Sequence, residues 1–95
     1  MTDIQHVRTQ VDRLDRRIVG LLADRERLVR QAGRLKTGTA AVRAPGRVEE
    51  VVARVRAIAA EAGASPDVAE RTYRAMIAAF IDLELATLAH PEEIG

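Results

Sequence analysis

The chain has few or none of the residues on which several common kinds of protein depend. Its 95 residues include no cysteine and no tryptophan, one tyrosine and one phenylalanine. Without cysteine there is no disulfide framework and no thiolate metal site, which permits a reducing compartment. Two aromatic residues are too few for a surface that stacks nucleic-acid bases. What remains is a small protein that we expect to form a single domain over residues 1–95.

Charge and hydropathy exclude two further kinds of partner. The formal net charge is +1, so we expect no general attraction to nucleic acid. No apolar run approaches the roughly 18 residues that a membrane-spanning helix needs. His6 and His90 lie near the two ends without the spacing of metal ligands, and we expect neither a metal nor a cofactor. The composition therefore predicts a soluble, cytoplasmic protein that binds neither nucleic acid nor membrane.

The first 36 residues carry an apolar pattern with one interruption. Apolar residues recur in steps of three and four, which is the spacing of one face of a single long helix from about Asp3 to about Lys36. This apolar stripe consists of Ile4, Val7, Val11, Leu14, Ile18, Leu21, Leu28, Ala32 and Leu35. Arg25 occupies a position where the pattern requires an apolar residue. An unpaired cation on a core face destabilises the fold by on the order of several kcal/mol. Arg25 therefore indicates either a core weakened by a buried charge or a pocket for an anion.

Two more helices are predicted, which makes the chain all-α with three helices. Residues 37–46 hold two glycines and a proline without a helical stripe, and we expect a loop there. One helix follows over about 45–62 and is closed by Gly63, and the last begins after Ser65 as N-cap and ends before Pro91. The residues expected to face inward are Val48, Val51, Val52, Val55, Ile58 and Ala59 on the first of these helices, and Tyr73, Met76, Ile77, Phe80, Ile81, Leu85 and Leu88 on the second.

The length of the first helix predicts the oligomeric state. A helix of about 34 residues is roughly 50 Å long, whereas a compact monomer of this size has a diameter of only about 32 Å. The helix would then project beyond its own subunit with its apolar stripe exposed. We therefore expect a second copy to lie antiparallel along it in an intertwined homodimer. An unusually long hairpin monomer is the alternative.

Several charged residues fall on inward faces of the predicted helices. Arg25 and Lys36, the only lysine, lie within about 20° of the same helix face and roughly 16 Å apart along the axis. Val29 and Ala32 make an apolar floor between them, so the two cations can clamp a small dianion. Arg8 lies roughly 25 Å further back on the same helix. It can therefore reach such a pocket only from the partner subunit.

The other two helices contribute one cation and one acid. Arg47 lies on the first turn of its helix, where the preceding loop can direct it inward. Glu84 lies on the apolar face of the last helix, and because apolar neighbours favour the neutral carboxyl, we expect it to donate a hydrogen bond. Each residue also has a simpler explanation: a surface position, a salt bridge such as Arg25 with Glu84, or, for Lys36, the helix dipole. Only the combination on inward faces predicts a shared polar ligand.

This set of residues resembles the all-α class of chorismate mutases over nearly the whole chain. The matching elements are Arg8, Val-Asp-Arg-Leu-Asp at 11–15, Leu-Leu-Ala-Asp-Arg at 21–25, Gly-Arg-Leu-Lys at 33–36, and Arg47. The resemblance implies three helices per subunit, an intertwined dimer, and two sites that each take one arginine from the partner. It also implies an isomerase of the shikimate pathway of aromatic amino acid biosynthesis, which rearranges chorismate to prephenate without a cofactor.

The resemblance further implies a role for each matching position. The partner's Arg8 and Arg25 would bind the two carboxylates of the substrate, and Lys36 would donate to the ether oxygen whose bond breaks. Arg47 would lie near the ring carboxylate and the side chain of the substrate. Catalysis would come from holding the chair-like conformer and from stabilising negative charge on the ether oxygen. The predicted catalytic residues are Lys36, Glu84 and Arg25, and the predicted substrate-binding residues are Arg8, Arg25, Lys36, Arg47, Val48, Phe80 and Glu84.

Three positions depart from the commonest pattern of this family and leave the substrate open. Ala44 and Val48 stand where acidic residues often contact the ring hydroxyl, and Glu84 stands where a glutamine usually donates to the ether oxygen. The run Ala-Pro-Gly-Arg-Val at 44–48 is more similar to isochorismate pyruvate lyase and to 4-amino-4-deoxychorismate mutase. Chorismate is the leading substrate, its 4-amino analogue the second, and the lyase reaction the third, because the lyases usually keep the glutamine. A helical dimerisation module without enzymatic activity is the remaining alternative.

Overall fold

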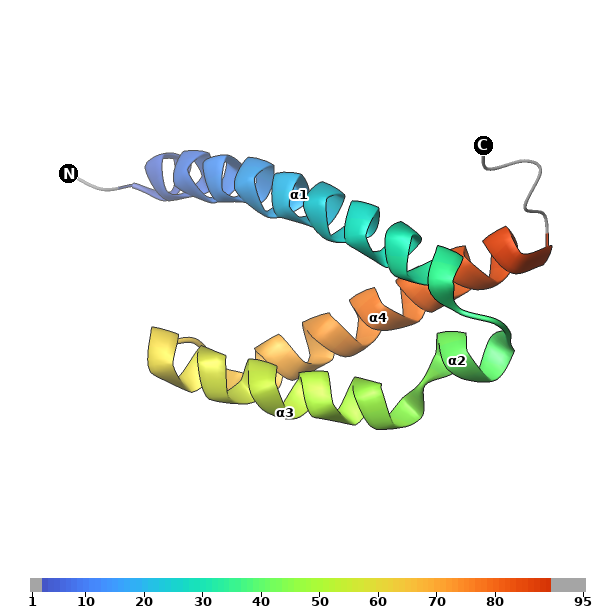
Figure 1. Ribbon diagram of the computed structural model, residues 1–95. Helices are drawn as coiled ribbons and strands as arrows, with labels where there is room; N and C mark the ends of the chain where they lie inside the picture. The colour runs from blue at the N-terminus through green and yellow to red at the C-terminus, as the bar shows by residue number, and fades with distance from the viewer. Residues whose placement is uncertain (1–2, 90–95) are drawn as a thin grey trace.

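Four helices account for nearly all of residues 3–89, the part of the chain that the computed structural model describes (Figure 1). They are α1 (Ile4–Leu35), α2 (Thr39–Arg43), α3 (Pro45–Ala62) and α4 (Pro66–Ala89). This part of the chain contains no strand, so the all-α prediction is confirmed. None of these helices combines the length and the apolar character that crossing a membrane requires. His90 and Pro91, named in the sequence-based predictions, lie outside the described residues.

The ends of the long helices coincide with capping signals in the sequence. Asp3 caps α1, because its side chain accepts a hydrogen bond of 2.9 Å from the backbone N–H of His6. Gly63 closes α3 with a φ of 79°, a left-handed conformation that glycine adopts without strain. At the start of α4, Ser65 Oγ accepts a hydrogen bond of 3.3 Å from the N–H of Val68. Local chemistry thus sets where these helices begin and end.

The connection between α1 and α3 was expected to be a loop, and that prediction is wrong for Thr39–Arg43. These five residues form α2, between Gly38 with a φ of 155° and Ala44 with a φ of 32°. Val42 is only 3% exposed, and its burial stabilises a helix far too short to be stable alone. So short a helix buries a single side chain, and it therefore leaves no periodic pattern in the sequence.

α3 and α4 form an antiparallel hairpin that contains most of the core. Val52 and Ala59 of α3 are buried, and α4 runs beside α3 before it crosses α1 (Figure 1). Ile58 and Leu88 were expected to face inward, but they are 53% and 38% exposed. The apolar face of each helix is wider than the contact between the helices, so its edge lies in solvent in the single subunit.

A network of ion pairs joins α3 to α4 on the outer side of the hairpin. Arg74 donates two hydrogen bonds of 2.8 Å to Glu49 and one of 2.7 Å to Glu70. Arg56 donates hydrogen bonds of 2.9 Å to Asp67 and to Glu70. The hydrogen bonds from Arg74 hold the pKa of Glu49 and the pKa of Glu70 below the usual value. The folded hairpin therefore favours both carboxylates in their ionised form.

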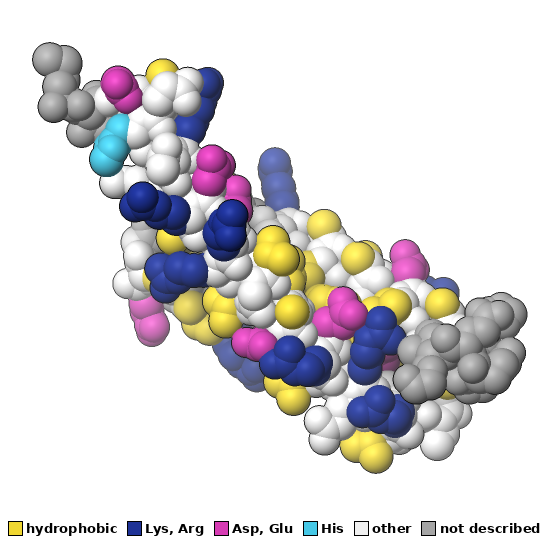
Figure 2. Space-filling view, turned by 90° about the horizontal axis from the view of Figure 1, so that it is seen from above, with side chains coloured by type: hydrophobic (Ala, Val, Ile, Leu, Met, Phe, Trp, Pro, Cys, Tyr) yellow, Lys and Arg dark blue, Asp and Glu magenta, His cyan; other side chains and the backbone are white. Residues whose placement is uncertain are grey.

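α1 packs on α4 through its C-terminal half, and its N-terminal half extends beyond this contact. The helix is 32 residues long, and residues 4–21 are all exposed. The six residues of the apolar stripe from Ile4 to Leu21 are between 42% and 66% exposed. The subunit is 55 Å long with a radius of gyration of 16.4 Å, against about 12 Å for a compact chain of this length. Figure 2 shows acidic and basic side chains interspersed, with apolar side chains exposed among them.

Candidate active site

A pocket of about 280 Å³ lies where the four helices meet. Its volume is close to the lower end of the range for small-molecule sites. The structure brings together the predicted site residues Arg25, Lys36, Arg47, Val48, Phe80 and Glu84 in the lining. Val29 and Ala32 line the pocket between Arg25 and Lys36, where the apolar floor was predicted. Arg8 lies on the exposed half of α1 and outside this lining, so its role in a partner's site stays a prediction.

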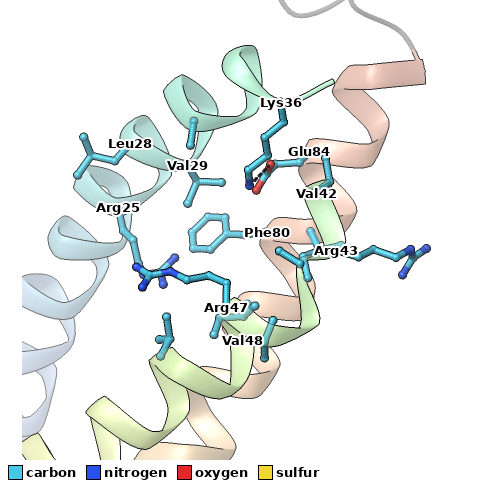
Figure 3. A pocket seen from close by; sticks show the side chains of 15 residues that line it. Arg25, Leu28, Val29, Lys36, Val42, Arg43, Arg47, Val48, Phe80 and Glu84 are labelled. Atoms are coloured by element: carbon cyan, nitrogen blue, oxygen red, sulfur yellow. Dashed lines mark hydrogen bonds and ion pairs between the residues drawn. The ribbon is translucent and has the colours of Figure 1, made fainter. Parts of the chain in front are cut away.

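Lys36 and Glu84 form an ion pair at one end of the pocket (Figure 3). Lys36 Nζ donates a hydrogen bond of 3.0 Å to Glu84 Oε2. The burial expected for Glu84 is confirmed, because its side chain is 8% exposed, against 28% for Lys36. Gly33 allows the close approach, since a Cβ there would lie 3.4 Å from Glu84 Oε2. In this contact Glu84 accepts a hydrogen bond, and its expected role as a donor to a substrate stays a prediction.

Arg25 contacts two aromatic rings and not the acid that was its alternative partner. Its guanidinium carbon lies 5.8 Å from the centroid of Tyr73 and 5.6 Å from that of Phe80, which is within the range of cation–π attraction. The alternative that Arg25 pairs with Glu84 is not realised, because Lys36 occupies that carboxylate. Tyr73 follows Arg25, and Glu84 follows Lys36, by the same 48 positions. A constant offset of this kind arises where two helices run in the same direction, as α1 and α4 do (Figure 1).

Arg47 reaches the pocket from the first turn of α3. The backbone N–H groups of Arg47 and Val48 donate to the carbonyl oxygen of Ala44 at 3.0 and 3.1 Å, so α3 begins at the bend made by Ala44. Figure 3 shows the guanidinium groups of Arg47 and Arg25 pointing toward one another, whereas Arg43 points away from the pocket. Arg47 also donates a hydrogen bond of 2.6 Å to Glu50. Arg47 thus lines the pocket while its side chain remains 58% exposed and paired with Glu50, and its role toward a ligand stays a prediction.

Sequence reasoning missed several residues of the site. The lining also includes residues that were assigned only to the core, the apolar stripe or the loop: Leu28, Val42, Arg43, Val51, Ile77 and Ile81. Tyr73 was assigned to the core, although it contacts Arg25. The available signal was its spacing from Phe80, because residues seven apart share one face of a helix. That spacing alone does not identify the cation between them.

The pocket carries an excess of positive charge. Arg25, Lys36 and Arg47 face a single carboxylate, that of Glu84, among the lining residues of the described chain. Among residues 3–89, no hydroxyl, thiol or imidazole side chain occurs in this lining. The arrangement therefore suits a small anionic ligand with an apolar framework, held by charge-assisted hydrogen bonds.

Comparison with known proteins identifies the family. Neither the curated proteins nor the solved structures give a significant match. The family model described as chorismate mutase type II matches residues 7–85. This range includes every predicted site residue, from Arg8 to Glu84. Because the match covers well over half of the sequence, the chain belongs to the chorismate mutase type II family.

Proposed function

We propose that the protein is a chorismate mutase that converts chorismate to prephenate by a Claisen rearrangement. Membership of the family supports an isomerase of this type. The observation that carries the proposal is the charge of the pocket. Among the described lining residues, Arg25, Lys36 and Arg47 outnumber the one acid, Glu84, and positive charge remains in excess even when the pairing of Arg47 with Glu50 is counted. Chorismate has one carboxylate on a compact ring and a second on its enolpyruvyl side chain, which matches both the excess positive charge and the apolar floor.

The side chains of the pocket would accelerate this reaction without a covalent intermediate. In the rearrangement the ether C–O bond breaks while a C–C bond forms, and no proton is transferred. Arg25 and Arg47 would hold the substrate in the chair-like conformer, in which the reacting carbons lie close together. Lys36 would donate to the ether oxygen, where negative charge develops. Glu84, whose Oε2 lies 3.0 Å from Lys36 Nζ, would be the second donor to this oxygen.

The proposal includes an intertwined homodimer with two shared sites. The exposed apolar stripe on the N-terminal half of α1 supports a second copy lying along it, because a stripe of this length is costly to leave in water. Arg8 lies on the same half of α1. A copy lying antiparallel along the stripe would therefore bring the partner's Arg8 toward the pocket, where it would bind the second carboxylate.

Chorismate is favoured over its 4-amino analogue by the wall that contains Ala44 and Val48. Both side chains are apolar, and the only acid in the described lining, Glu84, is paired with Lys36. An ammonium group on the ring would find no free carboxylate there, and a buried unpaired charge is costly. The lyase reaction on isochorismate remains the third possibility, because the run at 44–48 is similar to that of the lyases.

The choice of substrate is tested by giving the protein three compounds separately. Chorismate, isochorismate and 4-amino-4-deoxychorismate are each incubated with the purified protein, and the products are identified by mass spectrometry. We expect prephenate from chorismate as the main reaction. Pyruvate and salicylate from isochorismate, or turnover of the 4-amino compound alone, would replace the proposed substrate. No turnover of any of the three would refute the enzymatic function.

A dimerisation module without activity is distinguished by the variant Arg25→Leu. If Arg25 binds a substrate carboxylate, this change should lower kcat/KM by at least about a hundredfold. A module predicts instead an unchanged dimer and a more stable fold, because a cation is removed from the apolar stripe. Arg27→Leu is the matched control, since Arg27 lies two positions away with its side chain 71% exposed. That control should leave turnover unchanged.

A further inference from the structure

Both aromatic residues of the chain lie against the same arginine. The sequence contains one tyrosine, one phenylalanine and no tryptophan, and the guanidinium carbon of Arg25 lies within 6 Å of both rings, at 5.8 and 5.6 Å. Tyr73 and Phe80 are two turns apart on α4, roughly 10.5 Å along its axis and on one face. Arg25 reaches from α1 to a position between these two rings.

The two rings differ in their relation to the pocket. Phe80 lines it, whereas Tyr73 does not. Phe80 can therefore contact both a bound substrate and Arg25. Because Tyr73 contacts Arg25 but lies outside the lining, we expect its influence on a ligand to pass through Arg25.

An aromatic neighbour and an acidic neighbour have different effects on the charge and the N–H donors of an arginine. Arg74, for example, is bound by Glu49 and Glu70, which neutralise its charge and occupy its N–H donors. For Arg25, no carboxylate lies within ion-pair distance in the part of the chain that the structure describes. A ring attracts the cation through its face and leaves the charge and the N–H groups available.

We propose that Tyr73 is a positioning residue, which together with Phe80 holds the guanidinium of Arg25 at the pocket with its donors free for a substrate carboxylate. The proposal rests on the proposed function, because it assigns that carboxylate to chorismate. A long side chain loses rotamer freedom when it binds a ligand, and prior placement between two rings reduces this loss. Tyr73 would thus strengthen substrate binding without touching the substrate.

The kinetic test compares Tyr73→Leu with Tyr73→Phe and with Met76→Ala. Loss of the ring should raise KM for chorismate by roughly three- to thirty-fold with kcat within about twofold of the wild type, which is the range of a cation–π contact. Tyr73→Phe keeps the ring and should keep the wild-type KM. Met76 is half-buried on α4 and does not line the pocket, so Met76→Ala should lower stability with KM unchanged. A structural role for Tyr73 would likewise reduce only the amount of active enzyme, and so apparent kcat.

A second measurement needs no substrate. Ring currents from Tyr73 and Phe80 should shift the side-chain NMR signals of Arg25 upfield, and Tyr73→Leu should reduce this shift while Tyr73→Phe preserves it. Unchanged Arg25 signals in Tyr73→Leu, an unchanged KM, or a KM in Tyr73→Phe as high as in Tyr73→Leu would each overturn the proposal. If the wild-type protein does not convert chorismate, the proposed function fails, while the NMR comparison still decides whether Tyr73 holds Arg25.

Discussion

The ion pair between Lys36 and Glu84 predicts that stability and catalysis respond differently to the same substitutions. Lys36→Met leaves Glu84, which is 8% exposed, without its partner. Removing one member of a buried ion pair costs roughly 3–5 kcal/mol. Glu84→Leu leaves Lys36, which is 28% exposed and can turn its ammonium toward water, so we expect a smaller cost of about 1–2 kcal/mol. The difference in burial sets the order of the two losses.

The double variant Lys36→Met/Glu84→Leu separates the two effects. It removes both charges, and because apolar replacement of a buried ion pair is often neutral or stabilising, most of the lost stability should return. Activity should not return, because Lys36 and Glu84, the two proposed donors to the ether oxygen, are both absent. Loss of one such donor lowers kcat by about 10² to 10³ in comparable sites. The deficit in the double variant should be at least as large as that in Lys36→Met, where Glu84 remains.

Urea unfolding followed by circular dichroism measures the stabilities, at one protein concentration because a dimer's stability depends on concentration. Turnover is followed by the disappearance of chorismate. Arg54→Met is the control, since Arg54 and Glu50 pair with side chains 55% and 58% exposed, and such surface pairs contribute about 1 kcal/mol or less. A double variant as unstable as Lys36→Met, or one with near-wild-type kcat, would refute the reasoning.

Three further predictions concern the dimer, the start of α3 and the acid range. Arg8→Gln and Lys36→Met dimers should each be nearly inactive, but mixing them with subunit exchange should restore about a quarter of wild-type activity. The reason is that about half of the dimers are then mixed, and each mixed dimer carries one intact site out of two. No recovery would contradict a shared site. Ala44→Gly should stabilise the fold by about 1 kcal/mol, because alanine is strained in the left-handed region that Ala44 occupies with a φ of 32°. A lower Tm in this variant would count against the prediction. In the folded protein Arg74 holds the pKa of Glu70 below its ordinary value of 4.5. The ionised carboxylate therefore stabilises the fold at any pH above the unfolded pKa. This stabilisation is lost as the pH falls through the lower pKa of the folded state. Glu70→Gln should therefore flatten the decline of Tm in acid, and an equally steep decline would argue against the linkage.

Much of the fold could be predicted because its signals are local. The caps at Asp3, Gly63 and Ser65 act within one turn of the backbone, and the structure places them at the helix ends. Helical geometry also placed Arg25 and Lys36 on one face with Val29 between them. The pocket has those three residues in its lining because a rigid helix keeps its own register wherever it packs.

The errors arose where a segment is defined by its neighbours. α2 forms because Val42 finds a buried position between elements that are distant in sequence. Ile58 follows the apolar period of α3 yet is exposed, because the contact with α4 is narrower than the apolar face. Periodicity reports which side chains are available for burial. It does not report how many the partner helix can cover.

By itself, the sequence determined the all-α class, the three long helices and the inward cations, because capping and periodicity depend on residues a few positions apart. The partners of those cations were decided only by the tertiary structure. Lys36 pairs with Glu84, and Arg25 contacts Tyr73 and Phe80, across 48 to 55 positions of the chain. No local pattern selects among the acids of the chain at that distance, or shows that either ring reaches Arg25. The angle and offset at which α1 crosses α4 select them, and these follow from side-chain packing over the whole contact.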